Sequence, residues 1–278
     1  MELQSNYLNQ FALSEEPATD NLHALQATLA YLTKSNFVNP ALHDARLGKR
    51  GNVEDFQFEP VGVNYCDFCM SPLMGGEYDR LADGRDRCLR CTETVVRTKE
   101  EFADLFMYTK RQMSLAFDIT LNVSMQVRMV NAKEIAKKSG ETFSPTPGFD
   151  GRVLGYASYG SDGYTLNVEN GSPALALVST VAHEMTHIWQ YLNWDEVEIM
   201  DIYGEDNRLI VYEGMSSWAE TQYLYAIKEY EYAARMKAYY QQAEDEYGDG
   251  FRMYCEKYPL REDGVMNRET PFHSRWPL

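Results

Sequence analysis

One almost uncharged stretch constrains this chain more than any other feature of its 278 residues. The segment from Pro173 to about Leu192 carries a single formally charged side chain, Glu184. A helix that is apolar on most sides is stable only when neighbouring structure buries it. We therefore expect a buried central helix, with Ser172 as its N-cap and Pro173 as its first helical residue.

This helix carries the motif His183-Glu184-Met185-Thr186-His187. Positions i and i+4 lie on one helix face, one turn apart, so the two imidazoles can bind one zinc ion. Glu184 lies beside them without being a ligand, and we expect it to act as general base on a zinc-activated water. The motif is short and also arises by chance, but incidental histidines on a surface helix would have more charge around them. A buried His-Glu-His cluster without an ion would leave costly unpaired polar groups.

A catalytic zinc site of this kind needs a third protein ligand and one open position. Glu213, at the start of a second predicted helix, is the candidate ligand, although a solvated helix carboxylate is the plainer alternative. Small residues at 214, 216, 217 and 219 would let this helix approach the first one closely. Glu220 falls on the same face two turns later. It is either a rival ligand or the acceptor of a hydrogen bond from a ligand histidine.

Four of the five cysteines form two C-x-x-C pairs, Cys66 with Cys69 and Cys88 with Cys91. Two such pairs at this spacing are typical of a closed, four-thiolate zinc site that holds a small module together. Redox-active pairs are the alternative. The module would be structural or would dock a regulatory protein partner. Turns between the pairs are predicted at Gly75-Gly76 and Asp83-Gly84.

The remaining pattern places strands before helices, which indicates an α+β fold with a small mixed sheet. Strict apolar alternation over 119–129 predicts a half-buried strand, and 152–159 with 164–169 predict a hairpin closed by a turn at 160–163. Residues 35–60 resemble a linker, and the tail from Tyr247 onward is expected to be irregular. Helices are predicted at 20–34, from the capping box at Thr98–Glu101 to about Ala116, at 132–138, and over about 207–246 with one break.

The second hairpin strand precedes the motif helix and can be an edge strand. An extended peptide could pair with it at Asn167, Val168 and Glu169, although a purely structural role is equally compatible with the sequence. The oxyanion formed during hydrolysis also needs a hydrogen-bond donor. The candidate donors are Tyr212, Tyr223 and Tyr225.

Composition excludes some classes of partner. The chain has 26 basic and 42 acidic residues, and its net charge of −16 repels nucleic-acid phosphate, so we expect no nucleic-acid partner. No run is apolar enough to span a bilayer, and the N-terminus lacks the basic start and apolar stretch of a secretion signal. We expect no membrane partner and a cytoplasmic location, where paired cysteines favour zinc over disulfides.

Several segments together resemble a known family. These are Tyr78–Leu81, Asp83–Arg85, Cys88–Cys91, Ala182–Trp189 and Glu213-Gly214. They are similar to the LIM-associated zinc metallopeptidases of the plant "Da-one" growth-regulator type and their bacterial relatives, over roughly residues 60–235.

The resemblance implies a gluzincin-like site in which His183, His187 and Glu213 bind zinc and Glu184 is the catalytic base. Together with the pattern along the chain, it leads us to expect three regions: an N-terminal helical and linker region at 1–60, a zinc-ribbon or LIM-like module at 61–97, and a zincin-like metallopeptidase domain at 98–278. A full LIM domain has two zinc sites, whereas one set of four cysteines is present here. The plant proteins are linked to ubiquitin, but no ubiquitin-interacting motif is recognisable in this chain. The segment 193–207 is longer than in the plant proteins and is expected to form an extra loop beside the cleft.

We therefore expect a metallopeptidase that hydrolyses peptide bonds of protein or peptide substrates, with one catalytic and one structural zinc ion. The main alternative is a non-catalytic zinc-binding module for protein interaction. A zinc hydrolase acting on a non-peptide amide is a third possibility.

Overall fold

The computed structural model describes residues 63–73, 78–140, 143, 154–161, 163–264 and 269–274. The N-terminal region 1–60, with its predicted helix and linker, lies outside the described residues. The Gly75-Gly76 turn and the first residues of the predicted strand 152–159 also lie outside them.

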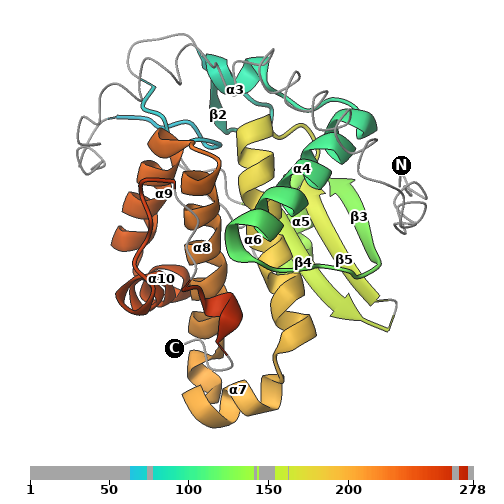
Figure 1. Ribbon diagram of the computed structural model, residues 1–278. Helices are drawn as coiled ribbons and strands as arrows, with labels where there is room; N and C mark the ends of the chain where they lie inside the picture. Colours follow the sequence, from blue (N-terminus) through green and yellow to red (C-terminus); the bar gives the residue numbers. More distant parts are fainter. Residues whose placement is uncertain are drawn as a thin grey trace.

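A small mixed sheet packs against a group of helices, as the sequence predicts for the α+β class (Figure 1). The sheet has the strand order β3-β5-β4, with β3 parallel and β4 antiparallel to β5. Helix α6 runs along the sheet and separates it from α8 and α9 (Figure 1). The strands are β3 (Met125–Val130), β4 (Gly155–Gly160) and β5 (Gly163–Glu169).

The hairpin of β4 and β5 is confirmed, with Gly160 opposite Gly163 as its last pair. The predicted strand over 119–129 is wrong in its first half. Ile119 and Leu121 are buried as the alternation requires, but the strand begins at Met125. Met125 pairs with the second residue of β5, so the residues before it have no strand opposite them.

The helices before and at the centre of the fold lie close to their predicted positions. Helix α4 (Lys99–Phe117) begins with the expected capping box between Thr98 and Glu101, and α5 (Ala132–Ser139) follows β3. The buried helix α6 (Ala174–Asn193) starts one residue late, because Pro173 and not Ser172 occupies the N-cap. The Ser172 hydroxyl instead donates a hydrogen bond to Glu169 (3.2 Å).

The C-terminal half is more helical than predicted. The expected break in the long helical region falls between α8 and α9, but the irregular tail is wrong, because α10 begins at Glu246. The extra loop at 193–207 is also mostly helical, in α7 and the short 3-10 helix η3. These elements are α7 (Glu196–Tyr203), η3 (Glu205–Asn207), α8 (Arg208–Ala226), α9 (Tyr230–Gln242), α10 (Glu246–Lys257) and η4 (Pro271–His273).

Helices α8 and α10 cross at two glycines. A Cβ atom on Gly214 would lie 2.4 Å from the Cα atom of Gly250, so neither position tolerates a side chain without a shift. We expected the small residue at 214 to permit close approach to the motif helix. It serves the contact with α10 instead.

The cysteine module contains β1 (Tyr78–Arg80), β2 (Asp86–Cys88) and α3 (Leu89–Glu93). Its buried side chains belong to the same hydrophobic cluster as those of α4, α6, α8 and α9. A buried ion pair of Arg85 with Glu169 ties the module to the end of β5. The hydrophobic core is therefore continuous across the predicted boundary at residue 97. No described helix has the length and hydropathy of a transmembrane segment.

Candidate metal centres

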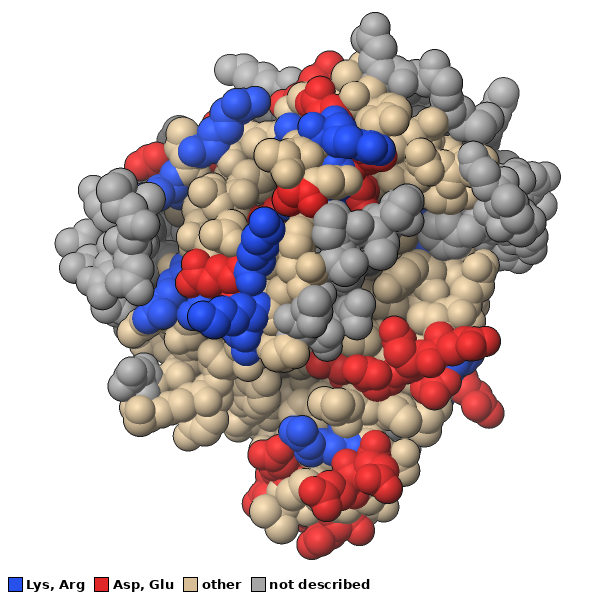
Figure 2. Space-filling model, turned by 180° about the vertical axis from the view of Figure 1, so that it is seen from behind, with Lys and Arg blue, Asp and Glu red and all other residues tan. Residues whose placement is uncertain are grey.

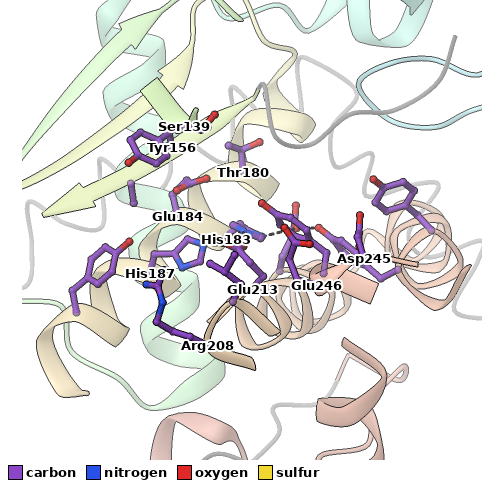
Figure 3. Close-up of a pocket in the computed structure, with 18 residues that line it drawn as sticks. Ser139, Tyr156, Thr180, His183, Glu184, His187, Arg208, Glu213, Asp245 and Glu246 are labelled. Atoms are coloured by element: carbon purple, nitrogen blue, oxygen red, sulfur yellow. Dashed lines mark hydrogen bonds and ion pairs between the residues drawn. The ribbon is translucent and has the colours of Figure 1, made fainter. Parts of the chain in front are cut away.

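Two helices bring three metal-binding atoms to one point. His183 and His187 lie on α6, and Glu213 lies on α8 (Figure 3). The two Nε2 atoms are 3.2 Å apart, and Glu213 Oε2 lies 3.3 Å from His183 Nε2 and 3.2 Å from His187 Nε2. A tetrahedral zinc ion with bonds of about 2.0–2.1 Å would hold its ligands about 3.3 Å apart. The spacing of these atoms therefore fits a zinc ion.

Both histidines face a hydrogen-bond acceptor with their other ring nitrogen. His183 Nδ1 lies 3.3 Å from Glu220 Oε2, and His187 Nδ1 lies 2.8 Å from Gln190 Oε1. Gln190 is itself held by its Nε2 atom, which donates to the Tyr212 carbonyl (2.9 Å). A proton on each Nδ1 leaves the Nε2 lone pairs facing each other and the Glu213 carboxylate. In that tautomer the three acceptors would repel one another, and a cation between them would relieve the repulsion.

The electrostatics of the group point the same way. Burial disfavours the imidazolium, but Glu213 and Glu220 outweigh burial and raise the pKa of His183 well above its usual value. Burial alone would raise the pKa of Glu213, but the two histidines hold it well below the normal range. The site is thus arranged to stabilise a cation.

Glu220 lies behind His183, on the side of the ring away from the other two ligand atoms. Its carboxylate accepts hydrogen bonds from the Ser179 hydroxyl and from Tyr240 Oη (2.7 Å), and it faces His183 Nδ1. Of the two alternatives, the structure places Glu220 as a partner of a candidate ligand. Ser179, Gln190 and Tyr240 were not identified from the sequence. Ser179 and Gln190 could have been, since they lie four residues before His183 and three after His187 on the same helix.

Glu184 is buried beside this group, and its Oε2 atom has no hydrogen-bond partner among the described residues. Burial raises the pKa of its carboxyl group, which also accepts a hydrogen bond from the backbone of Ala157 on β4. Strand β4 comes this close because of Gly155, where a Cβ atom would lie 2.9 Å from Glu184 Oε1 and 2.4 Å from Thr180 Cγ2. An unpaired buried carboxylate oxygen is energetically costly, and a chemical role is one reason for a protein to retain it.

The three candidate ligands and Glu184 face a cavity of about 380 Å³ (Figure 3). Gly155, Tyr156 and Ala157 of β4 line it, whereas the predicted contacts Asn167, Val168 and Glu169 do not. The placement of β5 as an edge strand is wrong, because β5 pairs with β3 on one side and β4 on the other. Asn167 and Val168 are buried, and Glu169 pairs with Arg85.

The predicted tyrosine donors also lie elsewhere. Tyr212 packs against Trp194 (ring centroids 5.1 Å apart), Tyr223 donates to Thr109 Oγ1 (3.4 Å), and Tyr225 packs against Tyr230. Helical spacing alone could not indicate which face each ring occupies. The tyrosines that line the cavity are Tyr156, Tyr191, Tyr239, Tyr240 and Tyr247. The rings of Tyr191 and Tyr247 flank the two histidines, Tyr191 at 6.4 Å from His187 and Tyr247 at 6.1 Å from His183.

The four cysteines form a second centre. The Sγ atoms of Cys66, Cys69, Cys88 and Cys91 all lie within 4.8 Å of one another, and those of Cys69 and Cys88 are 3.7 Å apart. Tetrahedral zinc with Zn–S bonds of about 2.3 Å separates its sulfurs by about 3.8 Å, whereas a disulfide needs about 2.05 Å. The backbone N–H of Cys88 donates to Cys66 Sγ (3.4 Å), and hydrogen bonding among the thiols, from Cys66 first, lowers the pKa of Cys88 to about 7. This group of four can hold a metal ion.

Comparisons of the chain with protein-family models, with curated proteins and with solved structures found no match. The geometry of the two centres is therefore the basis for assigning a function.

Proposed function

We propose that this chain is a zinc-dependent metallopeptidase of the gluzincin type, with a zincin-like domain at 98–278 as its sequence resemblance implies. One observation carries the proposal. Three acceptor atoms, from His183, His187 and Glu213, converge at an open cavity beside the unpaired buried oxygen of Glu184. A site with three protein ligands and an open side is characteristic of catalytic zinc.

Zinc bound by these residues would supply Lewis-acid chemistry, polarising a peptide carbonyl and lowering the pKa of water. Glu184 Oε2 is free to accept the proton that the attacking water loses, and the same carboxyl can then donate it to the leaving amine nitrogen. Its raised pKa brings the carboxyl closer to the pH at which it must do both. Tyr191 and Tyr247, which flank the histidines, are the candidate donors to the developing oxyanion.

An extended polypeptide is the substrate that best fits the cleft. Within the part of the chain that the structure describes, strand β4 pairs with β5 along one side only, and its residues Gly155–Ala157 line the cavity next to Glu184. A peptide added to this edge would place its backbone beside the metal-binding atoms. The sequence suggested that a substrate would pair with β5, and we now propose that it pairs with β4, which lies at the edge of the sheet.

Charge favours basic side chains in that substrate. Apart from the metal-centre residues, the charged side chains lining the cavity are Asp245, Glu246 and Arg208, and Arg208 is paired with Glu196 (2.7 Å). Acidic side chains also gather on the lobe that α7 forms at the foot of the molecule and in a second group above it (Figure 2). A cationic polypeptide would be attracted to this part of the surface.

The test is hydrolysis of unfolded proteins and a peptide library by the zinc-loaded chain. We expect cleavage that a chelator stops, that added zinc restores, and that Glu184→Gln abolishes while metal content and fold are retained. Cleavage unaffected by Glu184→Gln would refute the mechanism. A chain that retains its metal but cleaves only non-peptide amides would be a different hydrolase. If it cleaves nothing and Glu184→Gln leaves its biological effect unchanged, it is a binding module.

A further inference from the structure

Helix α9 contacts the cysteine module through three polar side chains. Tyr232 Oη donates to the carbonyl of Phe68 (3.0 Å), and Arg235 Nε donates to the carbonyl of Cys69 (2.7 Å). At the start of α9, Glu229 pairs with Arg90 of α3 (3.4 Å). Two of these contacts fall on the backbone of the Cys66–Cys69 pair itself, so the position of that loop and the position of α9 are linked.

The same helix also holds the residue behind His183. Tyr240 Oη donates to Glu220 Oε2 (2.7 Å). Glu220 in turn faces His183 Nδ1 (3.3 Å). Helix α9 therefore contacts the first cysteine pair through Tyr232 and Arg235, and, two turns further along, it contacts through Tyr240 the carboxylate behind His183.

Burial makes these contacts energetically important. Tyr232, Tyr240, Ser179 and Glu220 are each no more than 4% exposed, so water cannot replace a lost partner. In such surroundings a polar group left unpaired loses its solvation without compensation, and neighbouring groups shift to restore a partner. A displaced cysteine loop would move Tyr232 and with it α9, so Glu220 would lose part of the support that Tyr240 gives it.

We propose that α9 couples the two centres, with Tyr232 and Arg235 as positioning residues, so that a filled four-cysteine site strengthens metal binding by His183, His187 and Glu213. The inference rests on the proposed metal site but not on peptide hydrolysis. Partners that orient a ligand histidine typically contribute 10–100-fold to metal affinity. Coupling between two binding sites is reciprocal, so metal at the histidine centre also stabilises the cysteine site.

The experiment measures loss of metal from the full chain loaded with Co²⁺ at both centres. Cobalt bound to thiolates has strong sulfur charge-transfer absorption, whereas cobalt bound to nitrogen and oxygen has only weak d–d bands, so each centre can be followed separately. The variants are Tyr232→Phe and Arg235→Gln. The matched control is Tyr254→Phe, because Tyr254 is equally buried and donates to the Val211 carbonyl (3.1 Å), away from Glu220.

We expect Tyr232→Phe to lose histidine-centre cobalt to a chelator about tenfold faster than wild type, with the thiolate absorption unchanged at the start. Tyr254→Phe should remain within about twofold. Combining Tyr232→Phe with Glu220→Gln should add little to Glu220→Gln alone, because the effect of Tyr232 passes through Glu220.

Equal rates in Tyr232→Phe, Arg235→Gln and Tyr254→Phe would overturn the coupling. Fully additive effects of Tyr232 and Glu220 would also overturn it, because α9 would then be acting only on overall stability. If the wild type binds no cobalt at the histidine centre, the proposed metal site fails as well. A chain that binds cobalt there but cleaves no peptide would refute the peptidase and leave the coupling measurable.

Discussion

The two candidate metal centres are built in opposite ways. At the cysteine centre, the turn at Cys66–Cys69 and the junction of β2 with α3 supply four sulfur atoms, which surround a central point. At the histidine centre, long packed helices supply three ligand atoms, and the remaining side faces a cavity. Glu184 lies at that open side with an unpaired oxygen, and we see no counterpart to it among the described residues around the cysteines.

We propose that this difference is the one between a structural site and a reactive site. A closed set of four ligands leaves no place for substrate, and the ion then contributes to folding. An open set held by helices needs no ion to define its fold, because the side chains from Ala174 to Gln190 on α6 are buried in the core already. The comparison predicts that loss of metal lowers the stability of the fold at the cysteine centre and abolishes hydrolysis, without unfolding, at the histidine centre.

The largest expected effect is on stability at the cysteine centre. Replacing Cys66 and Cys69 with Ser should remove one metal ion and expose Phe68 and Met70, which are buried beside them. The binding free energy of structural zinc is about 10–16 kcal/mol in zinc-finger peptides, so we expect a clear loss of thermal stability. The matched double variant His183→Ala/His187→Ala should also lose one ion but keep most of its stability. Calorimetry with metal analysis compares the two, and the reverse ranking would break the comparison.

At the histidine centre, Glu213→Gln should weaken metal binding without unfolding the chain. The amide keeps the shape of the side chain but removes the negative charge that faces both Nε2 atoms. We expect affinity to fall by more than about 100-fold, because even residues behind the ligands contribute 10–100-fold. Competition with a chromophoric chelator measures it. Unchanged affinity would mean that Glu213 is not a ligand.

Close packing of β4 against α6 gives a third, intermediate effect. In Gly155→Ala the added methyl would press on Thr180 and Glu184, so we expect about 1–3 kcal/mol of destabilisation and a loss of hydrolysis. Gly160→Ala, in the same strand, is the control, because no atom lies within 4 Å of its Cβ position. Chemical denaturation and peptide assays of both variants test this. Equal stability and equal peptide hydrolysis in Gly155→Ala and Gly160→Ala would contradict a tight contact of β4 with α6.

The smallest predicted effect concerns substrate charge. Asp245→Asn removes a charge from the cavity wall but keeps an oxygen that can cap α10, where Asp245 accepts from the backbone N–H of Gly248 (3.0 Å). An ion pair between exposed charges is typically worth up to about 1 kcal/mol, so kcat/KM for a lysine-containing peptide should fall by up to several-fold relative to a norleucine analogue. Glu100→Gln, on the distant helix α4, is the control. If Asp245→Asn leaves the ratio of kcat/KM for the lysine peptide to kcat/KM for the norleucine peptide unchanged, Asp245 does not contribute to specificity through its charge.

Local spacing was sufficient to find most of the side chains that form the two candidate metal-binding groups. The histidine motif and the cysteine pairs each depend on a repeat within one helix turn or one loop, and the capping box at Thr98 is equally local. The prediction of Glu213 required only that the motif helix pack against the helix predicted from about residue 207. The pairing of distant strands could not be predicted from local spacing, because the position of β5 between β3 and β4 depends on a parallel crossover.

The missed helix α10 shows another limit. Gly248 and Gly250 each lower helix propensity by about 1 kcal/mol relative to alanine, so the sequence there indicates an irregular tail. The contact of Gly250 with Gly214 requires a residue without a side chain, and tertiary packing then outweighs propensity. The tyrosines around the cavity were missed because rings on neighbouring helix positions face different surroundings, which only the assembled fold defines.

Diffraction at the zinc absorption edge from crystals of the zinc-loaded chain tests the central claim most directly. We predict two anomalous peaks. One should lie among the four sulfur atoms, and the other about 2.0–2.2 Å from His183 Nε2, His187 Nε2 and a Glu213 oxygen, with its fourth side open to the cavity. A single peak at the cysteines, or a second ion whose ligands exclude Glu213, would contradict the account.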